Sequence, residues 1–156
     1  MSNFELTIPV VLIIFNRPHL VKRVFDEIRR AKPPRLYIIA DGPRPHHPDD
    51  VEKCLAARAI IEEVDWDCKV FKNFSDVNLG CGQRTASGLD WVFSLEEQAI
   101  IFDDDCLPHP TLFRFYQEML ERYRGDDRIV SIGGNNYRFK GQRSQYSYHC
   151  LRCTFH

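Results

Sequence analysis

The stretch Thr7–Phe15 reads TIPVVLIIF, and Asn16-Arg17-Pro18 follows it directly. A run this apolar and this rich in β-branched residues predicts a strand that is covered on both faces, as in a parallel sheet. A proline suits the first turn of a helix, and apolar residues then recur at helical spacing to about Arg30. The chain therefore begins with a buried strand followed by a helix.

The rest of the chain repeats this alternation. Further strands are predicted at Arg35–Ala40, Lys69–Phe74, Ala99–Phe102 and Arg128–Ile132. Helices are predicted between them, from Asp49 to about Val64, after the turn at Asn78–Gly82, and from near His109. Strands that alternate with helices predict an α/β fold of the Rossmann-like, three-layer α/β/α type with a mostly parallel sheet.

The helix predicted from Asp49 carries two more specific signals. Asp49 with Glu52 three residues later resembles a capping box. Its apolar side is expected to consist of Val51, Cys54, Leu55, Ile61 and Val64.

Composition narrows the class of protein. The 156 residues suit one domain or part of a larger one, and 44% hydrophobic residues are enough for a core. A net charge of −1 gives no general attraction to nucleic acid or to an anionic membrane. The longest apolar run is far shorter than the roughly 20 residues that span a bilayer, and no signal peptide is recognisable. We therefore expect a cytoplasmic protein with no transmembrane segment and with its six cysteines reduced.

Three acidic residues follow the strand predicted at Ala99–Phe102. Ligands of parallel α/β sheets bind at the carboxyl ends of the strands, which is where Asp103-Asp104-Asp105 lies. Alternation along an extended backbone points Asp103 and Asp105 the same way and Asp104 the other. No Lys or Arg between Arg84 and Arg114 neutralises them locally, whereas Mg²⁺ or Mn²⁺ would. The alternative is a solvated turn in which one Asp caps the next helix.

Two other strand ends carry polar candidates. Asp41-Gly42 could accept a hydrogen bond from a base or a ribose, although Asp-Gly is also a common turn. In Asn78–Arg84 (NLGCGQR), the glycines allow close backbone approach, and Arg84 could reach a diphosphate or a base edge. Neither a dinucleotide fingerprint nor a P-loop motif is present.

Together these segments resemble a known family. The segments IPVVLIIFNRP (8–18), Asp41-Gly42, NLGCG (78–82) with GLDW (88–91), and IIFDDDCLPHP (100–110) resemble the nucleotide-diphospho-sugar transferase superfamily. They are most similar to bacterial glycosyltransferases described as hemolytic-protein-like, over about residues 7–140. The acidic triplet corresponds to the DxD motif of that family.

The resemblance implies a GT-A fold, a nucleotide-diphosphate sugar donor (UDP- or another NDP-sugar), and Mn²⁺ or Mg²⁺ as cofactor. Asp103 and Asp105 would then bind the metal, with Asp103 and Asp104 also near the donor. Asp41 would hold the base. Asn16, Arg17 and Arg84 would lie near the base or diphosphate. No catalytic base is identified, and the glycan, lipid or protein acceptor is unknown.

Relatives of this family are about twice as long, so the chain is expected to be a C-terminally truncated, donor-binding half. Residues 1–140 form the predicted GT-A half-domain and residues 141–156 an irregular tail. In that tail His149, Cys150, Cys153 and His156 could chelate zinc, but four ligands within eight residues make a strained site. Two alternative functions stay open: a non-catalytic nucleotide-binding fragment, and a metal-dependent phosphoacceptor or phosphotransfer domain. The latter would need paired acids after the first strand, where Asn16-Arg17 stands.

Overall fold

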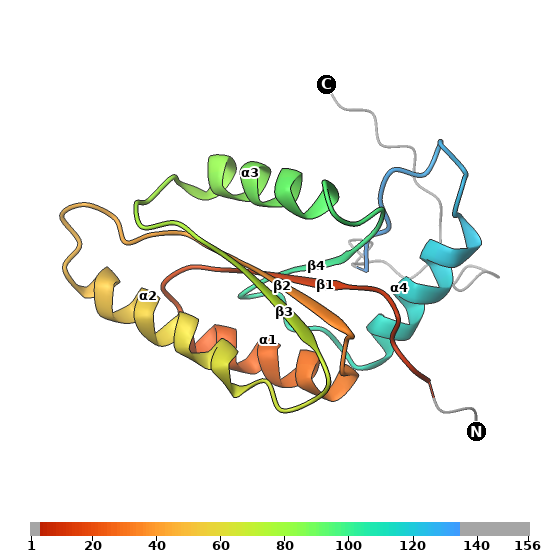
Figure 1. Ribbon diagram of the computed structural model, residues 1–156, viewed down its shortest axis with the longest axis horizontal. Coiled ribbons are helices and arrows are strands. Elements are labelled where there is room, and N and C mark those ends of the chain that lie inside the picture. Colours follow the sequence, from red (N-terminus) through yellow and green to blue (C-terminus); the bar gives the residue numbers. More distant parts are fainter. Residues whose placement is uncertain (1–3, 135–156) are drawn as a thin grey trace, which may run out of the picture.

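The computed structural model describes residues 4–134 and confirms the α/β class, with four parallel strands in the order β3-β2-β1-β4 (Figure 1). The predicted boundary at residue 140 and the tail with its zinc alternative lie outside the described residues. In chain order, the elements are β1 (Val10–Ile14), α1 (Pro18–Ala31), β2 (Arg35–Ala40), α2 (Asp49–Ala59), the 3-10 helix η1 (Ile60–Glu63), β3 (Lys69–Phe74), α3 (Cys81–Phe93), β4 (Ile100–Asp103) and α4 (Thr111–Arg122).

Helices cover both faces of this sheet, which gives three layers. Alternate residues of β1 point to opposite faces, as the period of a strand requires. Val10, Leu12 and Ile14 pack with α1, η1 and Phe113 of α4, whereas Val11 packs in a smaller cluster beneath α3. Figure 1 shows α1 and α2 on one side of the strands and α3 on the other. Because both faces of the central strands β1 and β2 are buried, their sequences are almost continuously apolar, as predicted, whereas the edge strand β3 is partly exposed.

The helix α1 has the face that its sequence predicts. Its buried residues are Val21, Val24, Phe25 and Ile28. It ends where Lys32 adopts a left-handed backbone with φ 50°, and Pro33-Pro34 follow. Within the described range, no helix is both long and apolar enough to span a bilayer.

Close packing of α3 on the sheet depends on Gly88. A Cβ atom at this position would lie 2.5 Å from Cγ2 of Ile39, a fully buried residue of β2. Only a residue without a side chain allows the helix to approach this closely. The same helix begins at the turn after β3, so its position decides where that turn lies.

The prediction of a fifth strand at Arg128–Ile132 is wrong. This segment is irregular: Ile129 donates its N–H to the Asp126 carbonyl in a turn, 2.9 Å away, and Val130 is 92% exposed. β-branched residues favour strands only where a neighbouring strand and a covering layer are available. In the part of the chain that the structure describes, β4 pairs with β1 alone.

The predicted apolar side of α2 is also wrong in part. Val51 is 51% exposed and Leu55 is 61% exposed, whereas Asp50 is buried together with Cys54 and Ala57. The helix therefore faces the sheet with the side that carries Asp50, and not with the side that carries Val51 and Leu55. The contacts that stabilise this carboxylate belong to the candidate site and are described below.

The capping box predicted at the start of α2 does not form. Pro48 occupies the N-cap position, and no side chain makes a capping hydrogen bond there. Asp49 lies near Lys53 instead, with 3.6 Å between Oδ2 and Nζ. The acidic residue that matters at this helix start is therefore Asp50, which the sequence pattern did not single out.

Candidate functional site

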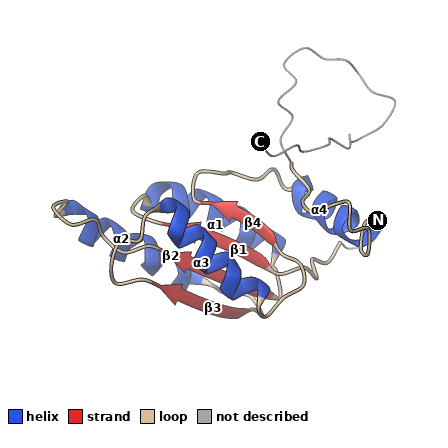
Figure 2. Cartoon of the chain, turned by 90° about the horizontal axis from the view of Figure 1, so that it is seen from above, coloured by secondary structure: helices blue, strands red, loops and turns tan. Residues whose placement is uncertain are grey.

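The carboxyl ends of the four strands gather at one edge of the sheet (Figure 2). From β1 the chain crosses to β2 on one side, whereas β4 joins β1 on the other side. The strand order therefore runs in opposite directions on the two sides of β1. This makes the β1–β4 junction the topological switch point, where open α/β sheets form their ligand-binding crevice. The turns that flank this junction are Phe15-Asn16-Arg17 and Asp103-Asp104-Asp105.

These two turns contact each other through Arg17. Its Nη1 lies 3.0 Å from Oδ2 of Asp105, and its Nη2 donates to Oδ1 of Asp104. The second oxygen of Asp104 accepts from Nε of Arg17 and from the N–H of Phe15, both at 3.4 Å. The triplet therefore has a neutralising cation, although none is near it in sequence. Three carboxylates and one guanidinium still leave a formal charge of −2 at the switch point.

The three acidic side chains lie in different environments. Asp104 is 2% exposed, whereas Asp103 and Asp105 are exposed, which agrees with the alternation predicted for the triplet. No hydrogen bond or ion pair within residues 4–134 involves the Asp103 carboxylate. Partial desolvation, followed by the charges of Asp105 and Asp104, raises the pKa of Asp103 above its ordinary value. Asp103 is thus the member of the triplet most open to a cation.

Asp103 and Asp105 offer carboxylate oxygens, the ligand type that Mg²⁺ and Mn²⁺ prefer. Among residues 4–134, no three His, Cys, Asp or Glu side chains converge as a preformed metal site. Asp103 is unengaged, and Oδ1 of Asp105 receives only a weak contact from the Cys106 thiol at 3.7 Å. Mg²⁺ commonly takes one or two protein carboxylates and fills its other positions with phosphate oxygens and water. Asp103 and Asp105 fit a cation that arrives with a phosphate ligand.

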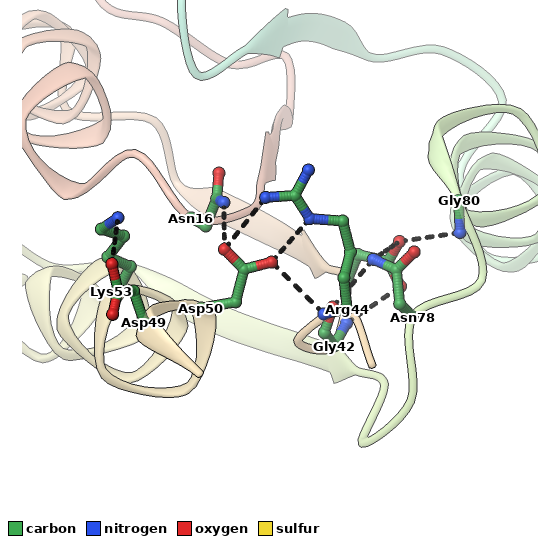
Figure 3. A network of polar contacts seen from close by, with 9 residues as sticks. Asn16, Gly42, Arg44, Asp49, Asp50, Lys53, Asn78 and Gly80 are labelled. Carbon is green, nitrogen blue, oxygen red and sulfur yellow. Dashed lines mark hydrogen bonds and ion pairs between the residues drawn. The ribbon is translucent and has the colours of Figure 1, made fainter. Parts of the chain in front are cut away.

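A second polar network centres on Asp50, a residue that is 2% exposed (Figure 3). Its Oδ1 accepts from Nδ2 of Asn16 at 2.7 Å and from Nη2 of Arg44 at 3.2 Å. Its Oδ2 accepts from Nε of Arg44 at 2.7 Å and from the Arg44 backbone at 3.3 Å. The hydrogen bond from Arg44, aided by Asn16, holds the pKa of Asp50 well below its ordinary value against the opposing effect of desolvation. Asp50 therefore joins the turn after β1 to the loop after β2.

The guanidinium of Arg44 also lies over an aromatic ring. Its Cζ is 5.6 Å from the centroid of Phe15, the first residue after β1. A planar cation at this distance from a ring face gains a cation–π attraction. Neither Arg44 nor Phe15 was predicted as a site residue, and an Arg six positions before an Asp gives no recognisable signal in sequence.

Asp41 is placed at the end of β2, as predicted, but the protein itself occupies its carboxylate. Its Oδ1 accepts from the N–H groups of Gly42 and Leu79, each at 2.9 Å. Its Oδ2 accepts from Nδ2 of Asn78 at 3.1 Å and from the N–H of Gly80 at 3.0 Å. With Asp41 only 6% exposed, these contacts argue against the predicted direct bond to a base. Asp41 instead fixes the turn before α3, to which Asn78 and Gly80 belong.

Arg84 likewise points into the protein. It is 4% exposed, and it donates to the backbone carbonyls of Ala40 (from Nε, at 3.1 Å) and Asn73 (from Nη2). Desolvation lowers its pKa. These bonds tie α3 to the ends of β2 and β3. Arg58, on the opposite face, donates to the Asp41 carbonyl at 3.0 Å in the same way. The predicted reach of Arg84 to a diphosphate is therefore not favoured by its position.

No protein-family model, curated protein or solved structure matches this chain. The fold and the site together define its class: a Rossmann-like α/β protein with a charged cluster at the β1–β4 switch point. Of the residues predicted from sequence, Arg17 and the triplet meet there, Asn16 lies beside them in the Asp50 network, and Asp41 and Arg84 organise the neighbouring turns.

Proposed function

We propose that this chain is a donor-binding domain of glycosyltransferase type, which binds a nucleotide-diphosphate sugar through a divalent cation for transfer of the sugar to an acceptor. One observation carries the proposal: Arg17 and the acidic triplet meet at the switch point of a parallel sheet. The acidic side chains would bind the metal ion of a metal–diphosphate complex, and the positively charged Arg17 would bind its phosphate oxygens.

The chemistry of glycosyl transfer fits this arrangement. Cleavage of the sugar–phosphate bond leaves negative charge on the departing diphosphate, and groups that stabilise this charge lower the barrier. Asp103 and Asp105 would hold Mg²⁺ or Mn²⁺, which supplies Lewis-acid stabilisation of the leaving group. Arg17, oriented by the buried Asp104, would lie beside the same oxygens. Transfer also needs a base for the acceptor hydroxyl, and we assign none of the described residues to that role.

Isothermal titration calorimetry tests the binding step. The protein is titrated with UDP, GDP and ADP and with their sugar conjugates, in Mn²⁺, in Mg²⁺ and in EDTA. We expect binding of at least one nucleotide that depends on the metal, and loss of that binding in the double variant Asp103→Asn/Asp105→Asn. The matched control is Asp49→Asn, because Asp49 is a highly exposed carboxylate whose ion pair within residues 4–134 is with Lys53.

Each negative outcome contradicts a different part of the proposal. Absence of heat with every nucleotide and sugar nucleotide in the presence of metal would reject donor binding. Equal affinity in EDTA would reject the metal. A donor-hydrolysis assay run beside the titration separates a transferase from a module that only binds nucleotide, and incubation with acetyl phosphate tests the phosphotransfer alternative.

A further inference from the structure

We infer that Arg44, held in place by Asp50 and Phe15, binds the nucleoside part of the ligand and not its phosphates. This inference rests on the proposed function, because it assigns a second contact for the same ligand. It concerns a residue that no sequence motif identified.

The first argument is that Arg44 is oriented in advance. Its Nε and Nη2 are both engaged by the buried carboxylate of Asp50, at 2.7 and 3.2 Å. Its Nη1 makes no hydrogen bond within residues 4–134, and the side chain is 45% exposed. A guanidinium that is fixed along one edge and free at the other loses little conformational entropy when it binds a ligand.

The second argument is the shape of this surface. Cζ of Arg44 lies over the Phe15 ring, 5.6 Å from its centroid, so an aromatic ring and a guanidinium stand next to each other at this surface. Planar groups stack on supported guanidinium and aromatic surfaces, and nucleobases are the planar part of a nucleotide. A base stacked here could also accept a hydrogen bond from the free Nη1.

The third argument is charge. Arg44 forms an ion pair with Asp50, which offsets its charge, so it acts mainly as a directional donor. A nucleobase carbonyl or a ribose hydroxyl is a neutral acceptor that suits such a donor, whereas a diphosphate needs uncompensated positive charge. In the proposed function that positive charge comes from the divalent cation that the triplet would hold.

The fourth argument is continuity between the two networks. Asn16 donates to Asp50 in the Arg44 network, and the next residue, Arg17, contacts Asp104 and Asp105. Figure 3 shows Asn16 and Arg44 meeting at the same carboxylate. A ligand lying across the end of β1 would therefore have its diphosphate near the triplet and its nucleoside near Arg44.

The test compares two ligands that share the diphosphate. Wild type, Arg44→Ala and Arg44→Lys are titrated with UDP and with inorganic pyrophosphate, each in Mn²⁺. Loss of a base-stacking contact predicts about tenfold weaker UDP binding in both variants. Pyrophosphate affinity should not change. The lysine variant keeps the charge but not the plane, so it supports the same conclusion if the alanine variant does not fold. Arg114→Ala is the control for loss of an arginine charge, because Arg114 forms an exposed ion pair with Glu118 on α4.

Unchanged UDP affinity in the variants would overturn the inference and leave the proposed function intact. An equal loss for UDP and pyrophosphate would also overturn it, because Arg44 would then act on the phosphates or on the whole site. If the wild type binds pyrophosphate but not UDP, the nucleoside contact is rejected and the metal–diphosphate site stands. If the wild type binds neither ligand, the proposed function itself fails.

Discussion

Nη1 of Arg17 lies 3.0 Å from Oδ2 of Asp105, although the two residues stand 88 positions apart in the chain. The same guanidinium bonds Asp104, which is buried. Arg17 thus partly neutralises the triplet, which is also what a bound divalent cation would do. A cation that binds Asp105 must compete with this contact.

Replacing Arg17 by Gln should therefore raise the affinity of the nucleotide-free protein for Mn²⁺. Removing one positive charge a few ångströms from a divalent ion should strengthen its binding by about tenfold. Calorimetric titration with MnCl₂, or the loss of the free-ion EPR signal, measures this. Arg17→Lys keeps the charge and serves as the control. Unchanged or weaker Mn²⁺ binding in the Gln variant would show that Arg17 and the metal do not compete.

Asp104 and Asp103 should differ in their contribution to stability. Asp104→Asn weakens buried, charge-assisted bonds to Arg17 and to the N–H of Phe15, so it should lower the free energy of unfolding by about 1–3 kcal/mol. Asp103→Asn removes an exposed charge that its neighbours repel, so stability should stay within about 0.5 kcal/mol of the wild type or rise. Urea denaturation followed by circular dichroism gives both values. Equal losses in the two variants would contradict this division of roles.

The sequence predicts most of the sheet because a short apolar or β-branched run between turn residues is a local pattern. Arg35–Ala40 and Lys69–Phe74 were predicted with the bounds that the structure gives. The segment Arg128–Ile132 has similar β-branched character, yet it forms no strand. The two predicted strands pair with neighbouring strands, whereas Arg128–Ile132 pairs with none in the described part of the chain. The presence of a partner strand depends on the whole fold and cannot be predicted from the segment alone.

The candidate site was predictable in location but not in its contacts. The acidic triplet stands out because three carboxylates follow a buried strand, whereas its counter-ion Arg17 is distant in sequence. Asp41 and Arg84 were predicted to face a ligand, but each is enclosed by backbone groups that only the folded chain brings near. Asp50 is buried because Arg44 and Asn16 stabilise its charge, and no periodicity reveals such a partnership.

Two glycines of α3 should respond oppositely to alanine. A Cβ at Gly88 would lie 2.5 Å from the buried side chain of Ile39, so Gly88→Ala should cost about 1–3 kcal/mol of stability as the helix moves off the sheet. A Cβ at Gly82 would meet nothing within 4 Å, and alanine favours a helix by up to about 1 kcal/mol. Gly82→Ala should leave stability unchanged or raise it. Thermal unfolding of both variants tests the pair, and a neutral Gly88→Ala would mean that α3 packs less tightly than described.

Tyr37 should make the protein sensitive to alkali. It is 2% exposed, and burial, followed by its 2.8 Å hydrogen bond to Glu96, raises the pKa of Tyr37 from 10.0 to about 12. Between these two values the folded protein keeps the phenol proton and the unfolded chain releases it. Unfolding therefore releases a proton, and its free energy falls as pH rises through this window, with a slope of at most about 1.4 kcal/mol per pH unit. The contribution is fully present below pH 10.

Tyr37→Phe removes this ionisation while keeping the ring against Phe71 and Trp91. Urea midpoints measured from pH 8 to 11 should fall less steeply above pH 10 in the variant than in the wild type. Glu96→Gln is a second test, because loss of the nearby carboxylate charge should lower the Tyr37 pKa, which tyrosinate absorbance at 295 nm reports. Parallel pH curves for wild type and Tyr37→Phe would mean that Tyr37 ionises in the folded protein as readily as in the unfolded chain, and that the contact with Glu96 does not hold its proton.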